Sequence, residues 1–208
     1  MSIEFDEKFW DERYRSAPLI WSGEPNAQLV VEASDLKPGS ALDVGCGEGA
    51  DAIWLAERGW RVTAIDISTV ALDRARSIDA APDVKRRIEW VHADLTVTAP
   101  PASSYDFVSV HFMQLQKAPR EALFRGLAAS VKPNGLLLVV GHHPDDLKTP
   151  GLRRPPIRDM LYTAGDIAAL LDPHDWNIET SGVRERPTEQ GGVNFTVYDA
   201  VLRARLRA

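Results

Sequence analysis

The chain has 208 residues, of which 44% are hydrophobic and 26% are charged, and its formal net charge is −6. This length suffices for one substantial domain, and the composition is ordinary for a globular protein. The excess of 30 acidic over 24 basic residues argues against a nucleic-acid binder, which needs a basic face. No apolar run approaches the roughly 18 residues of a membrane-spanning helix. A single cysteine, Cys46, excludes an internal disulfide and predicts a cytoplasmic location.

Residues 1–39 precede the first predicted core strand and are rich in aromatic side chains. Trp10 and Tyr14 are spaced to share one helical face, and a second, short helix is predicted over residues 27–33. We therefore divide the chain into this N-terminal helical lead, which can act as a lid, and a single compact unit over residues 40–208.

Strand and helix patterns alternate after residue 40. Strands are predicted over residues 41–44, 60–66, 88–92, 105–110 and 136–140, and helices over residues 50–58, 69–77 and 119–131. Alternation at this spacing predicts a parallel sheet with helices on both faces. Residues 163–166 predict a capped helix start.

The sequence after residue 175 predicts an antiparallel pair of strands. Strands over residues 176–184 and 194–202 are separated by a connection short enough for a hairpin, so they are expected to be antiparallel. Arg203 and Arg205 are expected on the solvent-facing side of an edge strand, where basic residues deter further pairing.

Prolines and glycines in residues 141–160 predict a loop at the sheet edge. This loop contains His142-His143-Pro144-Asp145-Asp146, a cluster that offers metal-binding side chains. Adjacent histidines point apart in an extended chain, and the cluster lacks a spaced ligand set. We predict no metal site here, and the role of the segment stays open.

A glycine turn joins the first predicted strand to the following helix. Gly45, Gly47 and Gly49 occupy this turn, where glycine permits a tight bend and a close approach of a ligand. The helix start is expected to offer unpaired N–H groups. Together these features predict a site for a nucleotide cofactor. They do not choose the cofactor, because Ala50 also completes the G-x-G-x-x-A pattern of dinucleotide-binding proteins.

Carboxylates at the strand ends narrow this choice. Asp66 ends the second strand and can accept hydrogen bonds from the ribose hydroxyls of NAD or of S-adenosylmethionine. Asp43 lies two residues before the first glycine, where a negative charge suits a ligand ammonium or sulfonium and opposes a pyrophosphate. Asp94 ends the third strand and can accept from an adenine amino group. The three acids favour S-adenosylmethionine.

Over essentially residues 20–205, the sequence resembles the class I S-adenosylmethionine-dependent methyltransferases. Residues 42–49, 64–68 and 93–95 are similar to that family's glycine, ribose and adenine motifs. Residues 21–26 resemble the small branch of tellurite-resistance and thiopurine methyltransferases. The resemblance implies an α/β, doubly wound, mostly parallel seven-stranded sheet with an antiparallel last strand. It also implies S-adenosylmethionine as cofactor and S-adenosylhomocysteine as product.

The resemblance also implies the site. Asp43 would orient the methionine part of the cofactor, partly through water, Asp66 would hold the ribose, and Asp94 would bind the adenine amino group. The full set of implied cofactor-binding residues is Asp43, Gly45, Cys46, Gly47, Asp66, Ile67, Ala93, Asp94, Leu95 and His111.

The expected reaction is methyl transfer to a small molecule, because no added recognition domain or basic groove is visible. The acceptor atom stays open among sulfur, selenium or tellurium, oxygen and nitrogen. A thiolate needs no base, whereas a hydroxyl or an ammonium must lose a proton. His111 and His142 follow the fourth and fifth strands and are the acceptor-side candidates for catalysis.

Two other functions stay open at this point. One is an NAD(P)-dependent oxidoreductase of the Rossmann type, and the other is a non-catalytic S-adenosylmethionine-binding protein. We expect no nucleic-acid or membrane partner, and either a monomer or a homodimer.

Overall fold

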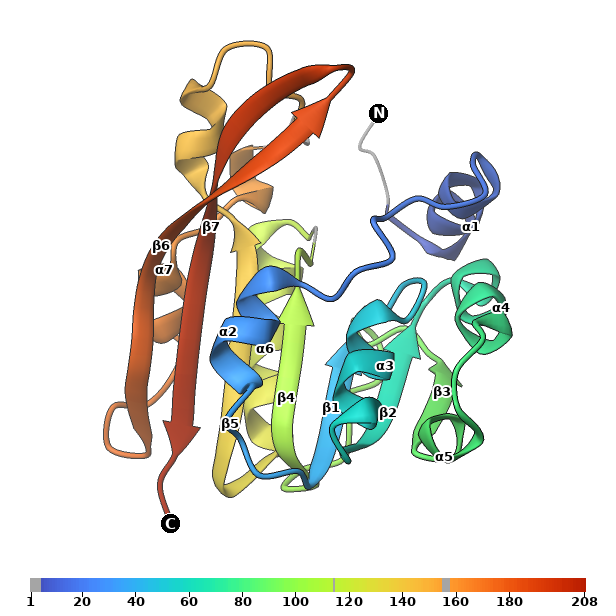
Figure 1. The fold of residues 1–208 in the computed structure, drawn as a ribbon. Helices are drawn as coiled ribbons and strands as arrows, with labels where there is room; N and C mark the ends of the chain where they lie inside the picture. Colours follow the sequence, from blue (N-terminus) through green and yellow to red (C-terminus); the bar gives the residue numbers. More distant parts are fainter. Residues whose placement is uncertain (1–4, 114, 155–157) are drawn as a thin grey trace.

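The computed structural model describes residues 5–113, 115–154 and 158–208. Seven strands form one sheet in the order β3-β2-β1-β4-β5-β7-β6 (Figure 1). The strands are β1 (Ser40–Val44), β2 (Arg61–Asp66), β3 (Ile88–His92), β4 (Tyr105–His111), β5 (Val131–His142), β6 (Trp176–Gln190) and β7 (Val193–Leu206). Strands β1 to β5 pair in parallel, and β7 is antiparallel to both β5 and β6. The predicted mostly parallel sheet with an antiparallel last strand is confirmed.

Helices cover both faces of this sheet (Figure 1). One face carries α2 (Ala27–Ala33), α3 (Ala50–Glu57), α4 (Thr69–Ser77) and α5 (Pro82–Lys85), and the other carries α6 (Lys117–Ser130) and α7 (Ala164–Ala168). Central strand β4 alternates between the two cores, with Phe107 packed in the first and Val108 in the second. Burial on both faces explains why its sequence is almost continuously apolar. No helix in the described ranges is long and apolar enough to cross a membrane.

The chain order of the strands reverses between β2-β1 and β4-β5. In open parallel sheets, ligands bind beyond the carboxyl ends of the strands at such a switch point. The carboxyl ends of β1, β2, β4 and β5 meet at the same edge, because these strands are parallel. The fold therefore brings the glycine turn, Asp66, His111 and His142 to one edge.

The C-terminal hairpin is longer than predicted. Its strands continue to Gln190 and from Val193, so that only Gly191 and Gly192 form the turn. Their φ angles of 60° and 78° lie in the region that glycine adopts without strain and that tight hairpin turns require. The expected edge position of Arg203 and Arg205 is wrong, since β7 is paired on both sides and β6 is the edge strand.

The described parts of the predicted loop, residues 141–154 and 158–160, are more ordered than expected. They include the 3-10 helices η1 (Pro144–Lys148) and η2 (Arg158–Met160), while residues 155–157 of the predicted loop lie outside the described residues. The predicted capping box at Thr163 is confirmed, because its side chain and that of Asp166 each accept from the other's backbone N–H. Helix α7 then ends at Ala168.

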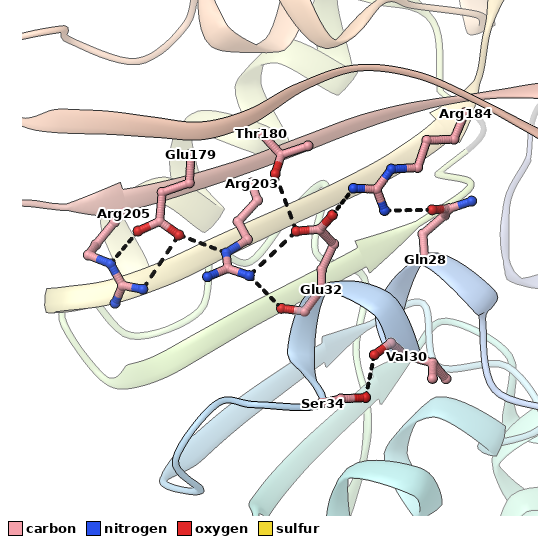
Figure 2. A network of polar contacts seen from close by, with 9 residues as sticks. All are labelled: Gln28, Val30, Glu32, Ser34, Glu179, Thr180, Arg184, Arg203 and Arg205. Carbon is pink, nitrogen blue, oxygen red and sulfur yellow. Dashed lines mark hydrogen bonds and ion pairs between the residues drawn. The ribbon is translucent and has the colours of Figure 1, made fainter.

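A network of polar contacts fixes α2 to the C-terminal strands (Figure 2). The carboxylate of Glu32 on α2 accepts from Arg184 of β6 and from Thr180, at 3.3 Å. Arg203 of β7 donates to the backbone oxygen of Glu32 at 2.8 Å and pairs with Glu179 at 2.7 Å. These contacts join residues near the two ends of the chain.

Helix α1 (Glu7–Arg15) lies against α4 on the carboxyl-end side of the sheet (Figure 1). The carboxylate of Asp11 accepts from the buried hydroxyl of Ser68 at 2.6 Å. Arg74 of α4 donates to the backbone oxygens of Tyr14 and Ala17. The lead is thereby docked beside the glycine turn.

Candidate active site

A cavity of about 1250 Å³ lies beyond the carboxyl ends of the central strands. The lead and the tip of the β6–β7 hairpin also contribute to its wall, and both lie on this side of the sheet in Figure 1. Nearly all of the predicted cofactor-binding residues line it, namely Gly45, Cys46, Gly47, Asp66, Ile67, Ala93, Asp94, Leu95 and His111. Both acceptor-side candidates, His111 and His142, line the same cavity.

The glycine turn is held in a shape that other residues do not readily adopt. The φ angles of Gly45, Gly47 and Gly49 are 68°, 53° and 88°, all in the left-handed region. A Cβ atom on Gly47 would lie 2.8 Å from the hydroxyl oxygen of Tyr14, and one on Gly49 would lie 2.5 Å from the ring of Trp90. Conformation and crowding therefore both require glycine here.

The backbone amides of this turn are used within the protein. The N–H groups of Gly45 and Cys46 donate to the carbonyl of Ile65 at 2.8 and 3.0 Å, and that of Gly47 donates to Oδ2 of Asp66 at 2.8 Å. These three N–H groups are therefore engaged within the protein, whereas the predicted unpaired N–H groups belong to the helix start at Ala50. The turn is shaped around a carboxylate of the protein itself.

Asp66 is buried at the end of β2 while still lining the cavity. Its Oδ1 accepts from the N–H of Ser68 at 2.8 Å, and its Oδ2 accepts from Gly47. Burial raises the pKa of this carboxyl, and the backbone hydrogen bonds oppose that rise. At the tip of β3, Oδ1 of Asp94 accepts from the backbone and hydroxyl of Thr96 at 2.8 and 2.6 Å. Two oriented carboxylates thus stand at neighbouring strand tips.

Asp43 does not reach the cavity, although the sequence placed it among the cofactor-binding residues. Its side chain is 2% exposed, and its Oδ2 has no hydrogen-bond partner among the described residues. Burial, with Asp51 and Asp66 nearby, raises the pKa of this carboxyl well above its usual value. The predicted role of Asp43, orienting the methionine part of the cofactor partly through water, stays a prediction.

His111 is held from both sides at the end of β4. Its Nδ1 lies 2.7 Å from Oδ2 of Asp51, and its Nε2 lies 3.1 Å from the hydroxyl of Ser109. Asp51 also accepts from the backbone N–H of Asn26 at 2.6 Å. The ring is therefore a fixed part of the wall. Sequence reasoning missed Asp51, because an acid in the first turn of a helix is ordinarily explained by the helix dipole alone.

His142 lies at the other end of the cavity, with its ring packed on Phe112 at a centroid distance of 4.5 Å. Burial, together with the positive charges of Arg154 and Arg186, lowers its pKa to about 3. The imidazole is therefore neutral at neutral pH and is a weak base. Arg186 was missed by sequence reasoning, because residue 186 fell in the predicted connection between the last two strands.

The remaining residues of the histidine cluster point in different directions. Nδ1 of His143 accepts from the N–H of Asp145 at 3.2 Å and begins η1. Asp146 is buried and accepts from Arg154 at 2.6 Å and from the N–H of Tyr198 at 2.7 Å. Across residues 5–113, 115–154 and 158–208, no group of three or more histidine, cysteine or acidic side chains is placed to hold a metal ion.

The lead is tied to the glycine turn by Glu48. Its buried carboxylate accepts from the N–H groups of Ile20 and Trp21, both at 3.1 Å, and from Arg74 at 2.8 Å. The indole N–H of Trp21 donates to the hydroxyl of Tyr14 at 3.0 Å. This aromatic pair lies directly over the Cα of Gly47, which places the lead at the glycine-turn end of the cavity.

Comparisons with known proteins agree with this architecture. Residues 41–135 match the family described as Methyltransferase domain. The chain is similar to the cypemycin N-terminal methyltransferase of a Streptomyces species, with 32% identity over 69% of this chain and 62% of that protein. The chain spans between 48 and 64% of the length of the first curated relatives it matches.

Solved structures show the same fold. A structure from work on the conversion of a disulfide bond into a thioacetal group during echinomycin biosynthesis has a TM-score of 0.71, with 20% identity over 97% of this chain and 91% of that one. TehB from Haemophilus influenzae has a TM-score of 0.66, with 18% identity over 97% of this chain and 67% of that one.

The fold and the match over the glycine turn and the strand tips define a methyltransferase domain. This match, the curated methyltransferase relatives and the fold support a class I S-adenosylmethionine-dependent methyltransferase. The likeness to TehB extends to the fold, and membership of its branch stays a prediction.

Proposed function

We propose that this protein transfers the methyl group of S-adenosylmethionine to a small-molecule acceptor. The observation that carries the proposal is the placement of Asp66, a buried carboxylate that lines the cavity and is bonded to Gly47 of the glycine turn. Each carboxylate oxygen can accept more than one hydrogen bond, so Asp66 can hold the turn and still receive the two ribose hydroxyls of an adenosyl group. Asp94, one strand further, suits the adenine amino group.

The same contacts disfavour a dinucleotide. Binding of a pyrophosphate at a glycine turn depends on free backbone N–H groups. The amides of Gly45, Cys46 and Gly47 are already bonded to Ile65 and Asp66. An NAD(P)-dependent oxidoreductase is therefore the weaker candidate.

When bound, the cofactor supplies an electrophilic methyl carbon. The acceptor's electron pair forms the new bond to this carbon as the carbon–sulfur bond breaks, and the released pair stays on sulfur to give S-adenosylhomocysteine. The protein contributes by holding the two molecules in line, which can supply roughly 7–11 kcal/mol. The single cavity that joins the cofactor end to the acceptor end provides this alignment.

The two histidines have different proposed roles. His111 is a positioning residue, because both ring nitrogens are engaged with Asp51 and Ser109. His142, with its lowered pKa of about 3, is a hydrogen-bonding group rather than a base. An acceptor that ionises readily fits this site best, since ionising a thiol with a pKa near 8.5 costs only about 2 kcal/mol at pH 7.

The lead supplies a lid in this proposal. Glu48 holds Ile20 and Trp21 by their backbone, and Trp21 and Tyr14 cover Gly47. Closure over the reacting atoms excludes water. We also propose that the protein acts in the cytoplasm. The single buried thiol of Cys46 supports this proposal, because free thiols persist in a reducing compartment.

Calorimetric titration of the purified protein with S-adenosylhomocysteine and, separately, with NADH tests the cofactor assignment. We expect binding of S-adenosylhomocysteine alone, whereas binding of NADH alone would overturn the proposal. Incubation with methyl-labelled cofactor and an extract of small metabolites then tests catalysis. Label transferred to a small product is expected, and tight cofactor binding with no transfer in any extract would favour a non-catalytic binding protein.

A further inference from the structure

Two arginines stand beside His142 at the acceptor end of the cavity. Arg154 and Arg186 come from the segment after β5 and from β6, and both line the cavity. The side chain of Arg154 is only 9% exposed. Its Nη2 is buried and has no hydrogen-bond partner within the described part of the chain. An unpaired buried donor is costly, so this nitrogen marks a place where a ligand acceptor atom belongs.

Each of the two arginines is paired with a buried aspartate. Nε of Arg154 is 2.6 Å from Oδ2 of Asp146, and Nε of Arg186 is 2.7 Å from Oδ2 of Asp199. Both aspartates are fully buried and neither lines the cavity. The carboxylates therefore orient the guanidinium groups from outside the cavity, and both arginines contribute to the cavity wall.

His142 lies next to the two arginines. Burial, helped by the positive charges of Arg154 and Arg186, lowers its pKa, so the imidazole stays neutral beside them. The neutral imidazole adds a further hydrogen-bonding group, since its Nδ1 also lacks a partner in the described residues. Glu189, further along β6, is exposed at the rim of the cavity. Water therefore screens its negative charge.

From this arrangement, and resting on the proposed methyl transfer, we propose that the acceptor carries a carboxylate that binds to Arg154 and Arg186 beside His142. Guanidinium groups match the geometry of a carboxylate and form strong, charge-assisted hydrogen bonds with it. The opposite end of the acceptor, which bears the nucleophilic atom, then points along the cavity toward the glycine turn. The carboxylate acts as the handle that aligns the acceptor.

Paired probes that differ only in charge test this proposal. Ligand-observed NMR titrations use para-hydroxybenzoate with para-hydroxybenzamide, and mercaptopropionate with mercaptopropionamide, each with and without S-adenosylhomocysteine. We expect at least one acid to bind the wild-type protein tenfold or more tightly than its amide. Equal binding of acid and amide in both pairs, or no binding of any probe, would overturn the carboxylate proposal.

Substitutions test whether Arg154 and Arg186 cause the preference for the acid over the amide. Arg154→Gln and Arg186→Gln are each expected to reduce the acid preference at least tenfold. Arg153→Gln, which removes an exposed neighbouring charge, is the matched control and should retain it. Thermal unfolding checks that each variant is folded. If Arg154→Gln does not fold, the test is made with Arg186→Gln alone. A preference that survives in a folded variant of either arginine would contradict the assignment.

The cofactor titration separates this proposal from the one on which it rests. We expect these variants to bind S-adenosylhomocysteine within twofold of the wild-type protein, because Arg154 and Arg186 lie at the acceptor end. Failure of the wild-type protein to bind S-adenosylhomocysteine would count against methyl transfer, and the acid preference measured without it would still decide the carboxylate site.

Discussion

Nδ1 of His111 lies 2.7 Å from Oδ2 of Asp51, and this contact ties the tip of β4 to the first turn of α3. The other oxygen of Asp51 accepts from the N–H of Asn26 in the lead at 2.6 Å. Three segments that are far apart in the sequence therefore meet around one carboxylate in the cavity wall. The shape of the cavity depends on this junction.

A double-mutant cycle measures the strength of the junction. His111→Ala and Asp51→Ala are each expected to lower the free energy of unfolding by about 1–3 kcal/mol, the cost of leaving a buried polar partner unpaired. The double variant should lose less than the sum, with a coupling of about 0.5–3 kcal/mol. Urea unfolding of the four proteins provides the measurement, and strictly additive losses would show that the two side chains do not cooperate.

Asp66→Asn tests the ribose assignment. The amide nitrogen cannot accept hydrogen bonds, so one contact to Gly47 or Ser68 and one to the ribose are lost. We expect S-adenosylhomocysteine to bind more weakly by roughly 1–3 kcal/mol, measured by calorimetry. Asp73→Asn is the control, because Asp73 is exposed on α4 and pairs with Arg76. Unchanged affinity in Asp66→Asn would count against the assignment.

Gly47→Ala tests the contact between the lead and the glycine turn. The added methyl group would lie 2.8 Å from the hydroxyl oxygen of Tyr14 at a φ of 53°. A left-handed conformation costs a residue with a Cβ about 1–2 kcal/mol, and the crowding should displace Tyr14. We expect lower stability and faster proteolysis of the lead.

Gly165→Ala is the matched control for that variant. A Cβ on Gly165 meets only ordinary contacts, the nearest at 3.6 Å, and this glycine lies in helix α7. Alanine there should be neutral or stabilising by up to about 1 kcal/mol. If limited proteolysis cleaves both variants at the wild-type rate, the predicted contact between Tyr14 and the glycine turn is wrong.

The network in Figure 2 predicts a difference between two glutamates. The side chain of Glu32 is 5% exposed and pairs with Arg184 and Arg203, whereas that of Glu179 is 22% exposed. Glu32→Ala should lower the free energy of unfolding by about 1–3 kcal/mol, because it removes the shared partner of charged groups. Glu179→Ala should cost about 0–1 kcal/mol. Equal losses in urea unfolding would show that the network does not centre on Glu32.

Acid sensitivity follows from the burial of His142. Its pKa is about 3 in the folded protein against an ordinary 6.5. Between these values the unfolded chain binds the proton and the folded chain does not, so the free energy of unfolding falls as the pH drops below about 6.5. The slope reaches about 1.4 kcal/mol per pH unit. His142→Asn should show a shallower decline than the wild-type protein in urea unfolding between pH 7 and about pH 4, and parallel declines would refute the lowered pKa.

The sequence predicted those elements that are determined by residues close to one another along the chain. The glycine turn, the alternation through β5 and the capping box at Thr163 each have a cause within a few residues. The site depends on longer connections: His111 binds Asp51 across 60 positions, and Glu48 binds Ile20 across 28. No periodicity signals such pairs. The role of Asp43 stays a prediction for a related reason, since its motif identifies the residue but not whether its side chain reaches a ligand.

The lead and residues 45–96 line the end of the cavity that we propose for the cofactor, while Arg154, Arg186 and the hairpin tip line the far end. The two halves of the cavity therefore draw on separate stretches of polypeptide. Under this proposal, lengthening the hairpin or rebuilding the segment after β5 would alter which acceptor is recognised without disturbing the cofactor half. Such a division lets one scaffold be retuned to new chemistry by exchanging two adjoining peripheral segments.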